Sequence, residues 1–99
     1  MNWKEITLSI GNSFVGVRRT IKYQYLGNLK VVGLSSSCSC STPAYDKKEK
    51  VVSVGFTPKP IPKHLVGKQN FYNTTKYITV TFENGTKTVL TFSTKVIKQ

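Results

Sequence analysis

The sequence predicts an all-β protein, an antiparallel β-sandwich of about seven short strands. Twelve threonines, five tyrosines and five phenylalanines favour a pleated sheet. Apolar and polar residues alternate over short stretches, which is the pattern of half-buried strands. Turn-forming residues recur at intervals of about ten residues, a spacing typical of sandwiches. A chain of 99 residues is the size of one domain, so residues 1–99 are expected to share a single core.

The N-terminal quarter is expected to form two strands. Apolar residues at positions 6, 8 and 10 alternate with Thr7 and Ser9, and a turn is predicted at residues 11–13, Gly-Asn-Ser. A longer strand then places five large side chains on one face: Val15, Val17, Ile21, Tyr23 and Tyr25. Arg19 falls on that apolar face, so it is expected at a sheet margin or beside a β-bulge.

The middle of the chain alternates between strands and polar connections. Residues 29–34 are predicted to form a strand, and residues 35–42 form a segment of small side chains closed by Pro43. Residues 46–50 form a charged turn before a strand at 51–56. Prolines at positions 58, 60 and 62 cannot occupy a central strand, because each removes a backbone donor. We expect a long loop or a bulged edge segment from there to about residue 74, and such loops are often functional.

The C-terminal third contains a predicted β-hairpin. Ile78, Val80 and Phe82 alternate with threonines, Asn84-Gly85 interrupts the pattern, and the alternation then resumes through residues 90–93. Asn-Gly readily adopts positive φ at both central positions of a type I′ turn, so this is the turn type we expect. No helix longer than a single turn is predicted anywhere in the chain.

Charge is the strongest compositional feature. Fifteen Lys and Arg face only four acids, which gives a formal net charge of +11. Such a field attracts nucleic acid, an anionic membrane face or an acidic protein surface, although a solvated basic surface with no dedicated partner is the plainer alternative. No apolar run is long enough for a membrane helix, and the first residues lack the apolar stretch of a secretory signal. We therefore expect no membrane partner and no export by that route.

Enzymatic chemistry is not indicated. The single histidine, His64, lies in a Pro/Lys-rich stretch with no serine or cysteine motif to pair with it. Four scattered carboxylates do not form an acid/base pair, and no glycine-rich phosphate loop is present. The sequence thus predicts a protein that is not an enzyme and has no catalytic, cofactor-binding or metal-binding residues.

The two cysteines, Cys38 and Cys40, could in principle form a disulfide or bind a metal. In an extended strand, residues two apart share a face and lie about 6.6 Å apart along it, so a bridge would need a sharp bend. A tetrahedral zinc site would need a second pair of Cys or His within the chain. We expect two free, metal-free thiols that pack as small hydrophobic side chains.

A single-stranded nucleic-acid platform is an alternative, because aromatic and basic residues are interleaved. Candidate cations are Arg18, Lys22 and Lys76, and the candidate stacking residues are Tyr23, Tyr25, Phe71, Tyr72 and Tyr77. However, Tyr23 and Tyr25 share a predicted face with Ile21, which indicates that they belong to the core.

Three stretches carry a resemblance to a known family: residues 25–28 (Tyr-Leu-Gly-Asn), residues 29–32 and residues 37–43 (Ser-Cys-Ser-Cys-Ser-Thr-Pro). With Phe56 and the closing strands, the stretch from about residue 17 to 97 resembles a bacterial immunoglobulin-like domain family of unknown function that has a Cys-Gly-Cys-Thr motif. The chain departs from that pattern: Ser39 replaces the motif glycine, Ser41 is an extra residue, and Gly27-Asn28 reverses the family order. The resemblance implies an immunoglobulin-like sandwich and no catalytic residues.

A lone immunoglobulin-like domain without an export signal is similar to the auxiliary, or decoration, proteins of bacteriophage capsids, an analogy at the level of the fold. The expected function is that of a non-enzymatic structural virion protein, made in the host cytoplasm. Its expected partners are other virion proteins, first of all the major capsid protein. The alternatives are a nucleic-acid-binding β-domain and a bacterial envelope adaptor domain.

A docking face for this role would be basic. The expected interface residues are Arg18, Lys22, Lys47, Lys48, Lys59 and Lys63. Ile61, Leu65 and Val66 are expected to add apolar contacts from the proline-rich loop.

Overall fold

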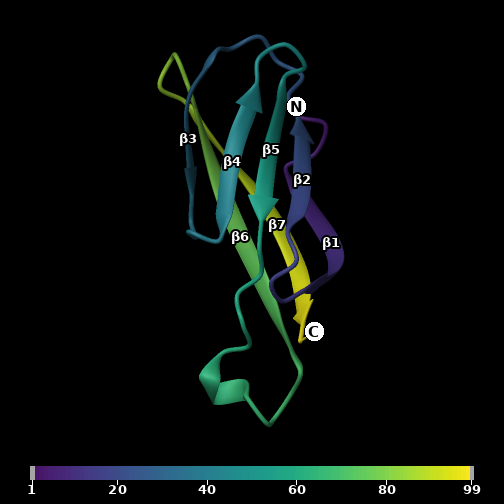
Figure 1. Ribbon diagram of the computed structural model, residues 1–99. Helices are drawn as coiled ribbons and strands as arrows, with labels where there is room; N and C mark the ends of the chain where they lie inside the picture. Colours follow the sequence, from purple (N-terminus) through teal and green to yellow (C-terminus); the bar gives the residue numbers. More distant parts are fainter. Residues whose placement is uncertain (1, 99) are drawn as a thin grey trace.

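The computed structural model describes residues 2–98, without the side chain of Leu65, and forms a sandwich of two packed sheets (Figure 1). The four-stranded sheet has the order β1 (Thr7–Phe14), β7 (Lys87–Ile97), β6 (Phe71–Phe82) and β3 (Val31–Ser36). The three-stranded sheet has the order β2 (Arg19–Gln24), β5 (Val51–Phe56) and β4 (Ser41–Asp46). The predicted all-β sandwich of about seven strands is confirmed.

Six of the seven strands follow the order found in immunoglobulin sandwiches. With the strands lettered A to G along the chain, β2-β5-β4 reproduces B-E-D and β7-β6-β3 reproduces G-F-C. The first strand differs, because β1 pairs in parallel with β7 in the four-stranded sheet. This pairing places the end of β1 beside the end of β7, where Phe14 lies opposite Ile97.

The core consists of the inward-facing residues of both sheets. Ile21, Tyr23, Val52, Val54 and Phe56 come from the three-stranded sheet, and Ile78, Val80, Phe82, Leu90 and Phe92 come from the four-stranded sheet. At one end Trp3 packs on Tyr25 and Phe82, and toward the other Phe56 meets Phe92 edge-on. The sequence assignment of Tyr23 and Tyr25 to the core is confirmed, whereas Val17 is exposed.

The turn predicted at residues 11–13 is wrong. The chain continues through them as part of β1, and the register against β7 shifts between Ser9 and Asn12 as in a bulge. Gly11 takes a φ of +70°, which glycine adopts without steric cost. The turn between β1 and β2 comes later, around Gly16, so Val15 and Val17 belong to this connection and not to a strand.

The prediction for Arg19 is confirmed. Its guanidinium donates to the carbonyl oxygens of Asn12 and Ile10 on either side of the bulge, at 2.7 and 3.3 Å, and to the hydroxyl of Ser13 at 3.1 Å. Thr94 donates to the carbonyl of Gly11, so the Ser13 hydroxyl must donate to Thr94 across their 2.7 Å contact. This chain of donors satisfies the backbone groups that the bulge leaves unpaired.

The strand β4 was not predicted. The small-residue segment was predicted to extend to residue 42 and the charged turn to begin at residue 46, yet residues 41–46 pair with β5 along their whole length. Pro43 is tolerated because β4 is an edge strand, where the missing donor can face away from the ladder.

The prediction of two free thiols is also wrong. Cys38 and Cys40 form a disulfide, with their Cα atoms 5.2 Å apart. The 6.6 Å spacing applies to an extended strand, but β3 ends at Ser36 and residues 37–40 bend and turn into β4. The bend brings the two cysteines within the Cα separation that disulfides require.

The C-terminal hairpin is confirmed, with a different turn. The amide of Gly85 donates to the carbonyl of Phe82, and only Gly85 takes a positive φ, of +87°. This is a type I turn followed by a left-handed glycine, not the expected type I′. Asn84 is free to accept bonds from the amide and hydroxyl of Thr86 through its side-chain oxygen.

The proline-rich segment is a loop from residue 57 to 70, with one short 3-10 turn (Lys63–Leu65). It projects from the end of the sandwich opposite the hairpin turn (Figure 1). The loop is shorter than predicted, because β6 begins at Phe71. Within residues 2–98, no helix has the length and apolar character needed to cross a membrane.

Candidate binding site at the basic end

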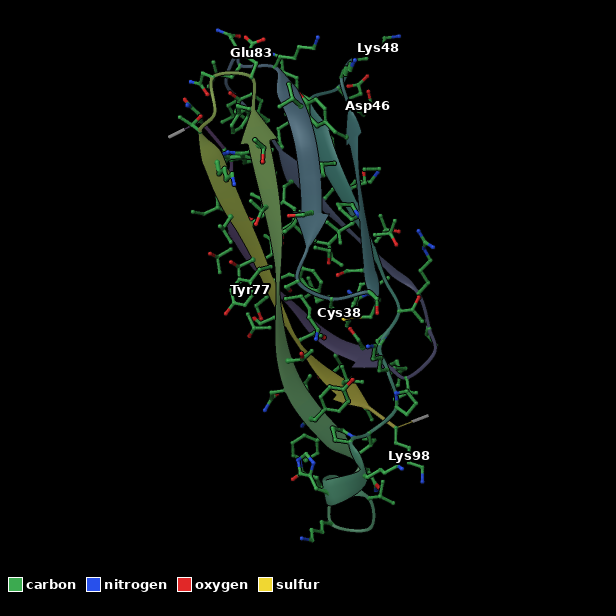
Figure 2. All side chains as sticks on the ribbon, turned by 90° about the vertical axis from the view of Figure 1, so that its left-hand side faces the viewer. Cys38, Asp46, Lys48, Tyr77, Glu83 and Lys98 are labelled. Atoms are coloured by element: carbon green, nitrogen blue, oxygen red, sulfur yellow. A yellow bond between two sulfur atoms is a disulfide. The ribbon has the colours of Figure 1, made fainter. Side chains whose placement is uncertain are left out.

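All four acidic side chains lie at one end of the elongated molecule. Glu83 follows β6 directly, Asp46 ends β4, and Glu49 lies in the turn before β5. Glu5 lies beside the end of β2, where the amide of Lys4 donates to the carbonyl of Gln24. Figure 2 shows Asp46 and Glu83 at this end and Lys98 at the opposite one.

Eight of the fifteen cations lie in the opposite half of the molecule, which contains no Asp or Glu side chain. They come from the start of β2, the loop at residues 57–70, β6 and the end of β7: Arg18, Arg19, Lys59, Lys63, Lys68, Lys76, Lys95 and Lys98. We call this region the basic end. The molecule measures 49 Å along its long axis, several Debye lengths at physiological salt, so the acids at the far end do not neutralise it.

The loop of the basic end is fastened to the sandwich by backbone contacts. The amide of Gly16 donates to the carbonyl of Pro58, and the Tyr72 hydroxyl donates to the carbonyl of Lys59 at 2.8 Å. At the other end of the loop, the amide of Lys98 donates to the carbonyl of Asn70. These bonds hold the loop between the β1–β2 connection and the end of β7.

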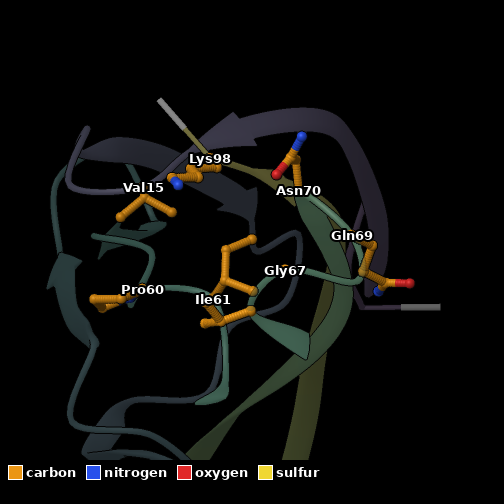
Figure 3. A pocket seen from close by; sticks show the side chains of 8 residues that line it. Val15, Pro60, Ile61, Gly67, Gln69, Asn70 and Lys98 are labelled. Carbon is orange, nitrogen blue, oxygen red and sulfur yellow. The ribbon is translucent and has the colours of Figure 1, made fainter. Parts of the chain in front are cut away.

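A pocket of about 400 Å³ opens between these three segments (Figure 3). Its apolar wall consists of Val15, Pro60, Ile61 and Val66, and Val66 is 63% exposed. Polar groups at its margin are Gln69, Asn70 and Lys98. An exposed apolar hollow with the cation Lys98 at its margin fits an apolar group that is attached to an acidic chain.

Three tyrosines have a raised pKa. Burial raises the pKa of Tyr23, whose hydroxyl donates to the carbonyl of Thr91, and burial also raises the pKa of Tyr45 and Tyr72. The Tyr23 and Tyr72 phenols each donate a hydrogen bond to a backbone carbonyl. Among the described residues, no three His, Cys, Asp or Glu side chains gather in a way that could hold a metal ion.

The six docking residues predicted from sequence occupy three separate regions. Lys59 and Lys63 lie in the loop of the basic end, and Lys47 and Lys48 lie in the β4–β5 turn, beside Asp46 and Glu49. Lys22 projects from the outer face of the three-stranded sheet, and Arg18 precedes β2. Of the apolar residues predicted to help them, Ile61 and Val66 line the pocket, and the side chain of Leu65 lies outside the described part of the chain.

Arg18 links the outer face of the three-stranded sheet to the basic end. Its guanidinium lies over Gly55 of β5, in the space that a Cβ atom would occupy. The absence of a side chain at Gly55 thus leaves room for the Arg18 guanidinium on the sheet.

The five aromatic residues considered for nucleic acid do not form one platform. Tyr23 and Tyr25 are buried, and Tyr72 is engaged with the loop through Lys59. Phe71 lies under the ammonium of Lys95, 4.2 Å from its ring centroid, whereas Tyr77 projects from the middle of β6, in the four-stranded sheet.

Six residues of this region were not predicted from the sequence: Lys68, Lys95, Lys98 and the pocket residues Val15, Gln69 and Asn70. One signal could have indicated the region, since no acid occurs between Glu49 and Glu83. The contribution of β7 was not visible, because it depends on the parallel pairing with β1.

Comparisons of the chain with protein-family models, with curated protein sequences and with solved structures found no match.

Proposed function

We propose that this protein is a non-enzymatic docking domain that attaches through its basic end to an acidic protein surface. One observation carries the proposal: eight cations and an apolar pocket share one end of the molecule, and every acidic side chain is at the other. The other seven cations exceed the four acids, so the rest of the molecule is also net positive. The larger excess of positive charge at the basic end still orients the protein as it approaches an acidic partner.

The pocket supports a protein as the partner. Exposed ion pairs contribute only about 0–1 kcal/mol each, so charge alone gives weak, salt-sensitive attachment. An apolar side chain of the partner buried against Val15, Pro60 and Ile61 would contribute about 1.5–3 kcal/mol that salt does not screen. Steering by charge and anchoring by the pocket are therefore separate, complementary contributions.

A virion is the proposed setting, with the acidic surface provided by the shell of a bacteriophage capsid. The immunoglobulin-like strand order and the basic charge support this setting by analogy only. Mass spectrometry of purified particles tests it separately, and stoichiometric abundance of the chain is the expected result. Absence from the particles would remove the virion setting and leave the docking chemistry to be tested on its own.

Binding to labelled peptides tests the docking chemistry. The probes are a short Glu-rich peptide with one central Phe and the same peptide with Gly in place of the Phe, measured by fluorescence anisotropy. The Phe peptide should bind more tightly, and this advantage should persist as salt is raised, because burial in the pocket is not screened. Equal affinities at all salt concentrations would contradict a role for the pocket.

Nucleic acid is the second candidate, because the same cations attract phosphate. For duplex DNA, log affinity should fall with log salt by about 0.9 per neutralised phosphate. Tight binding to an unrelated DNA fragment at physiological salt, with a slope of several units, would favour this candidate over a protein surface. Binding that vanishes near 0.15 M salt would reflect nonspecific attraction by the net charge.

A further inference from the structure

The Cys38–Cys40 disulfide lies at the bend between β3 and β4, where its two sulfurs have different surroundings. Cys38 Sγ accepts a hydrogen bond from the amide of Cys40 at 3.2 Å. Cys40 faces a second, smaller pocket of about 210 Å³, which Cys38 does not line. Both cysteines are half-buried, so neither sulfur is sealed in the core.

The pocket at Cys40 contains two cations. Lys59 comes from the proline-rich loop and Lys76 from β6, and the remaining walls are Phe56, Pro60, Pro62 and Tyr72. Since the four acids lie at the other end of the molecule, the field in this pocket favours an anion.

Hydrogen bonds that do not involve the sulfur atoms also hold the bend at the cysteines. The Ser36 hydroxyl donates to the carbonyl of Cys38 at 2.8 Å, and the amide of Cys38 donates back to the Ser36 hydroxyl. Two hydrogen bonds join Ser37 to Tyr77. The Ser37 amide donates to the Tyr77 carbonyl, and the Tyr77 amide donates to the Ser37 hydroxyl. The two sulfurs therefore stay adjacent when the bridge is opened, which favours its reformation.

We propose that Cys38 and Cys40 form a thiol–disulfide exchange site for small anionic thiols, with Cys40 as the sulfur that is attacked. The site shares Lys59, Lys76 and Pro60 with the basic end, but its chemistry does not require an acidic protein partner.

The exchange takes place in two steps. The thiolate of the small molecule attacks Cys40 Sγ, the Cys38–Cys40 bond breaks, and its electron pair leaves with Cys38 Sγ as a thiolate. The amide of Cys40, already directed at Cys38 Sγ, stabilises this leaving group. A second small thiolate then attacks the small-molecule sulfur of the mixed disulfide. The bond to Cys40 Sγ breaks, and the products are the small-molecule disulfide and the Cys40 thiolate. In total, the protein disulfide is reduced by two electrons and two small thiols are oxidised to one disulfide, and the reverse sequence reoxidises the protein.

Glutathione and 2-mercaptoethanol are the probes, because the first is anionic and the second is uncharged. The rate of opening of the bridge is measured by rapid alkylation and mass spectrometry for each thiol. In a Lys59→Gln/Lys76→Gln variant, the ratio of the glutathione rate to the mercaptoethanol rate should fall about two- to tenfold, the range expected for two partly exposed cations. The matched control is Lys30→Gln/Lys87→Gln, which removes two exposed charges away from the pocket and should leave the ratio unchanged.

Single-cysteine variants identify the reacting sulfur. Cys38→Ser leaves Cys40 in the pocket, and its reaction with oxidised glutathione should retain the dependence on Lys59 and Lys76. Cys40→Ser leaves Cys38 outside the pocket, and its reaction should show no such dependence. The proposal is overturned by an unchanged rate ratio in the Lys59→Gln/Lys76→Gln variant, or by two free thiols in the isolated, air-oxidised protein.

Discussion

Arg19 on β2 donates a hydrogen bond of 2.7 Å to the carbonyl oxygen of Asn12 in β1, and this contact joins the two sheets at the bulge of β1. The same guanidinium donates to the Ser13 hydroxyl. The Ser13 hydroxyl donates to the Thr94 hydroxyl, which in turn donates to the carbonyl of Gly11. Arg19 thus stabilises the bulge that interrupts the regular pairing of β1 with β7.

Replacement of Arg19 should therefore destabilise the protein. Arg19→Met keeps the aliphatic length but leaves the carbonyls of Asn12 and Ile10 and the Ser13 hydroxyl without this donor, at an expected cost of about 1–3 kcal/mol. Chemical denaturation measures the free energy of unfolding. The control is Arg18→Met, because Arg18 rests on the outer face over Gly55 and its loss should change stability by no more than about 0.5 kcal/mol. Equal effects of the two substitutions would contradict the role of Arg19.

Gly27 is expected to tolerate no side chain. A Cβ atom there would overlap the ring and hydroxyl of Tyr25, a buried residue that accepts a hydrogen bond from the amide of Leu29. Gly27→Ala should cost about 1–3 kcal/mol, the range for overpacking in a core. Gly33→Ala is the matched control, since its Cβ would meet only Thr81 at 3.6 Å, an ordinary contact. A thermal midpoint lowered by both or by neither would show that Tyr25 does not restrict this position.

The hairpin turn depends on a left-handed residue at position 85. Gly85 has a φ of +87° with open space around it, so the effect of a substitution is conformational and not steric crowding. Gly85→Val should cost about 1–3 kcal/mol, because β-branched residues avoid this region. Gly85→Asn should be milder, since Asn tolerates it. Thermal unfolding of both variants tests whether Gly85→Val lowers the midpoint more than Gly85→Asn. A midpoint unchanged by Gly85→Val would contradict the turn geometry.

Alkaline pH should weaken the fold through Tyr23. Burial raises the pKa of its phenol above the value of about 10 in the unfolded chain. Above that pH the unfolded chain releases the proton while the folded protein retains it, so stability falls as pH rises. Thermal midpoints between about pH 8 and about pH 11 should decline more steeply for the natural chain than for Tyr23→Phe. Parallel declines would show that Tyr23 does not cause the effect.

Features that depend on interactions between residues close in the chain could be predicted from the sequence. The Asn84-Gly85 hairpin, the loop with prolines at 58, 60 and 62, and the misfit of Arg19 on an apolar face all follow from short patterns, and the structure contains each of them. The type of the hairpin turn was less accessible, because Asn84 uses its side chain to bind Thr86 and keeps a negative φ.

Features that depend on distant segments were missed. The bend that brings Cys38 to Cys40 is held in part by Ser37 and Tyr77, which are forty residues apart in the sequence. The strand β4 takes its register from β5 despite Pro43. The basic end assembles only when β1 pairs with β7 and brings Val15 beside Lys98, so no local pattern could define the pocket.

Binding to an acidic partner should depend on the cations of the basic end and not on the total net charge. A pair of variants with equal net charge tests this most directly. Lys63→Gln/Lys68→Gln/Lys98→Gln removes three exposed cations from the basic end, and Lys30→Gln/Lys47→Gln/Lys87→Gln removes three exposed cations from outside it. Affinity for the Glu-rich peptide with a central Phe is measured by anisotropy at fixed salt. We expect the first variant to lose at least about fivefold in affinity and the second less than about twofold. Equal losses in the two variants would show that only net charge matters and would contradict a docking site at the basic end.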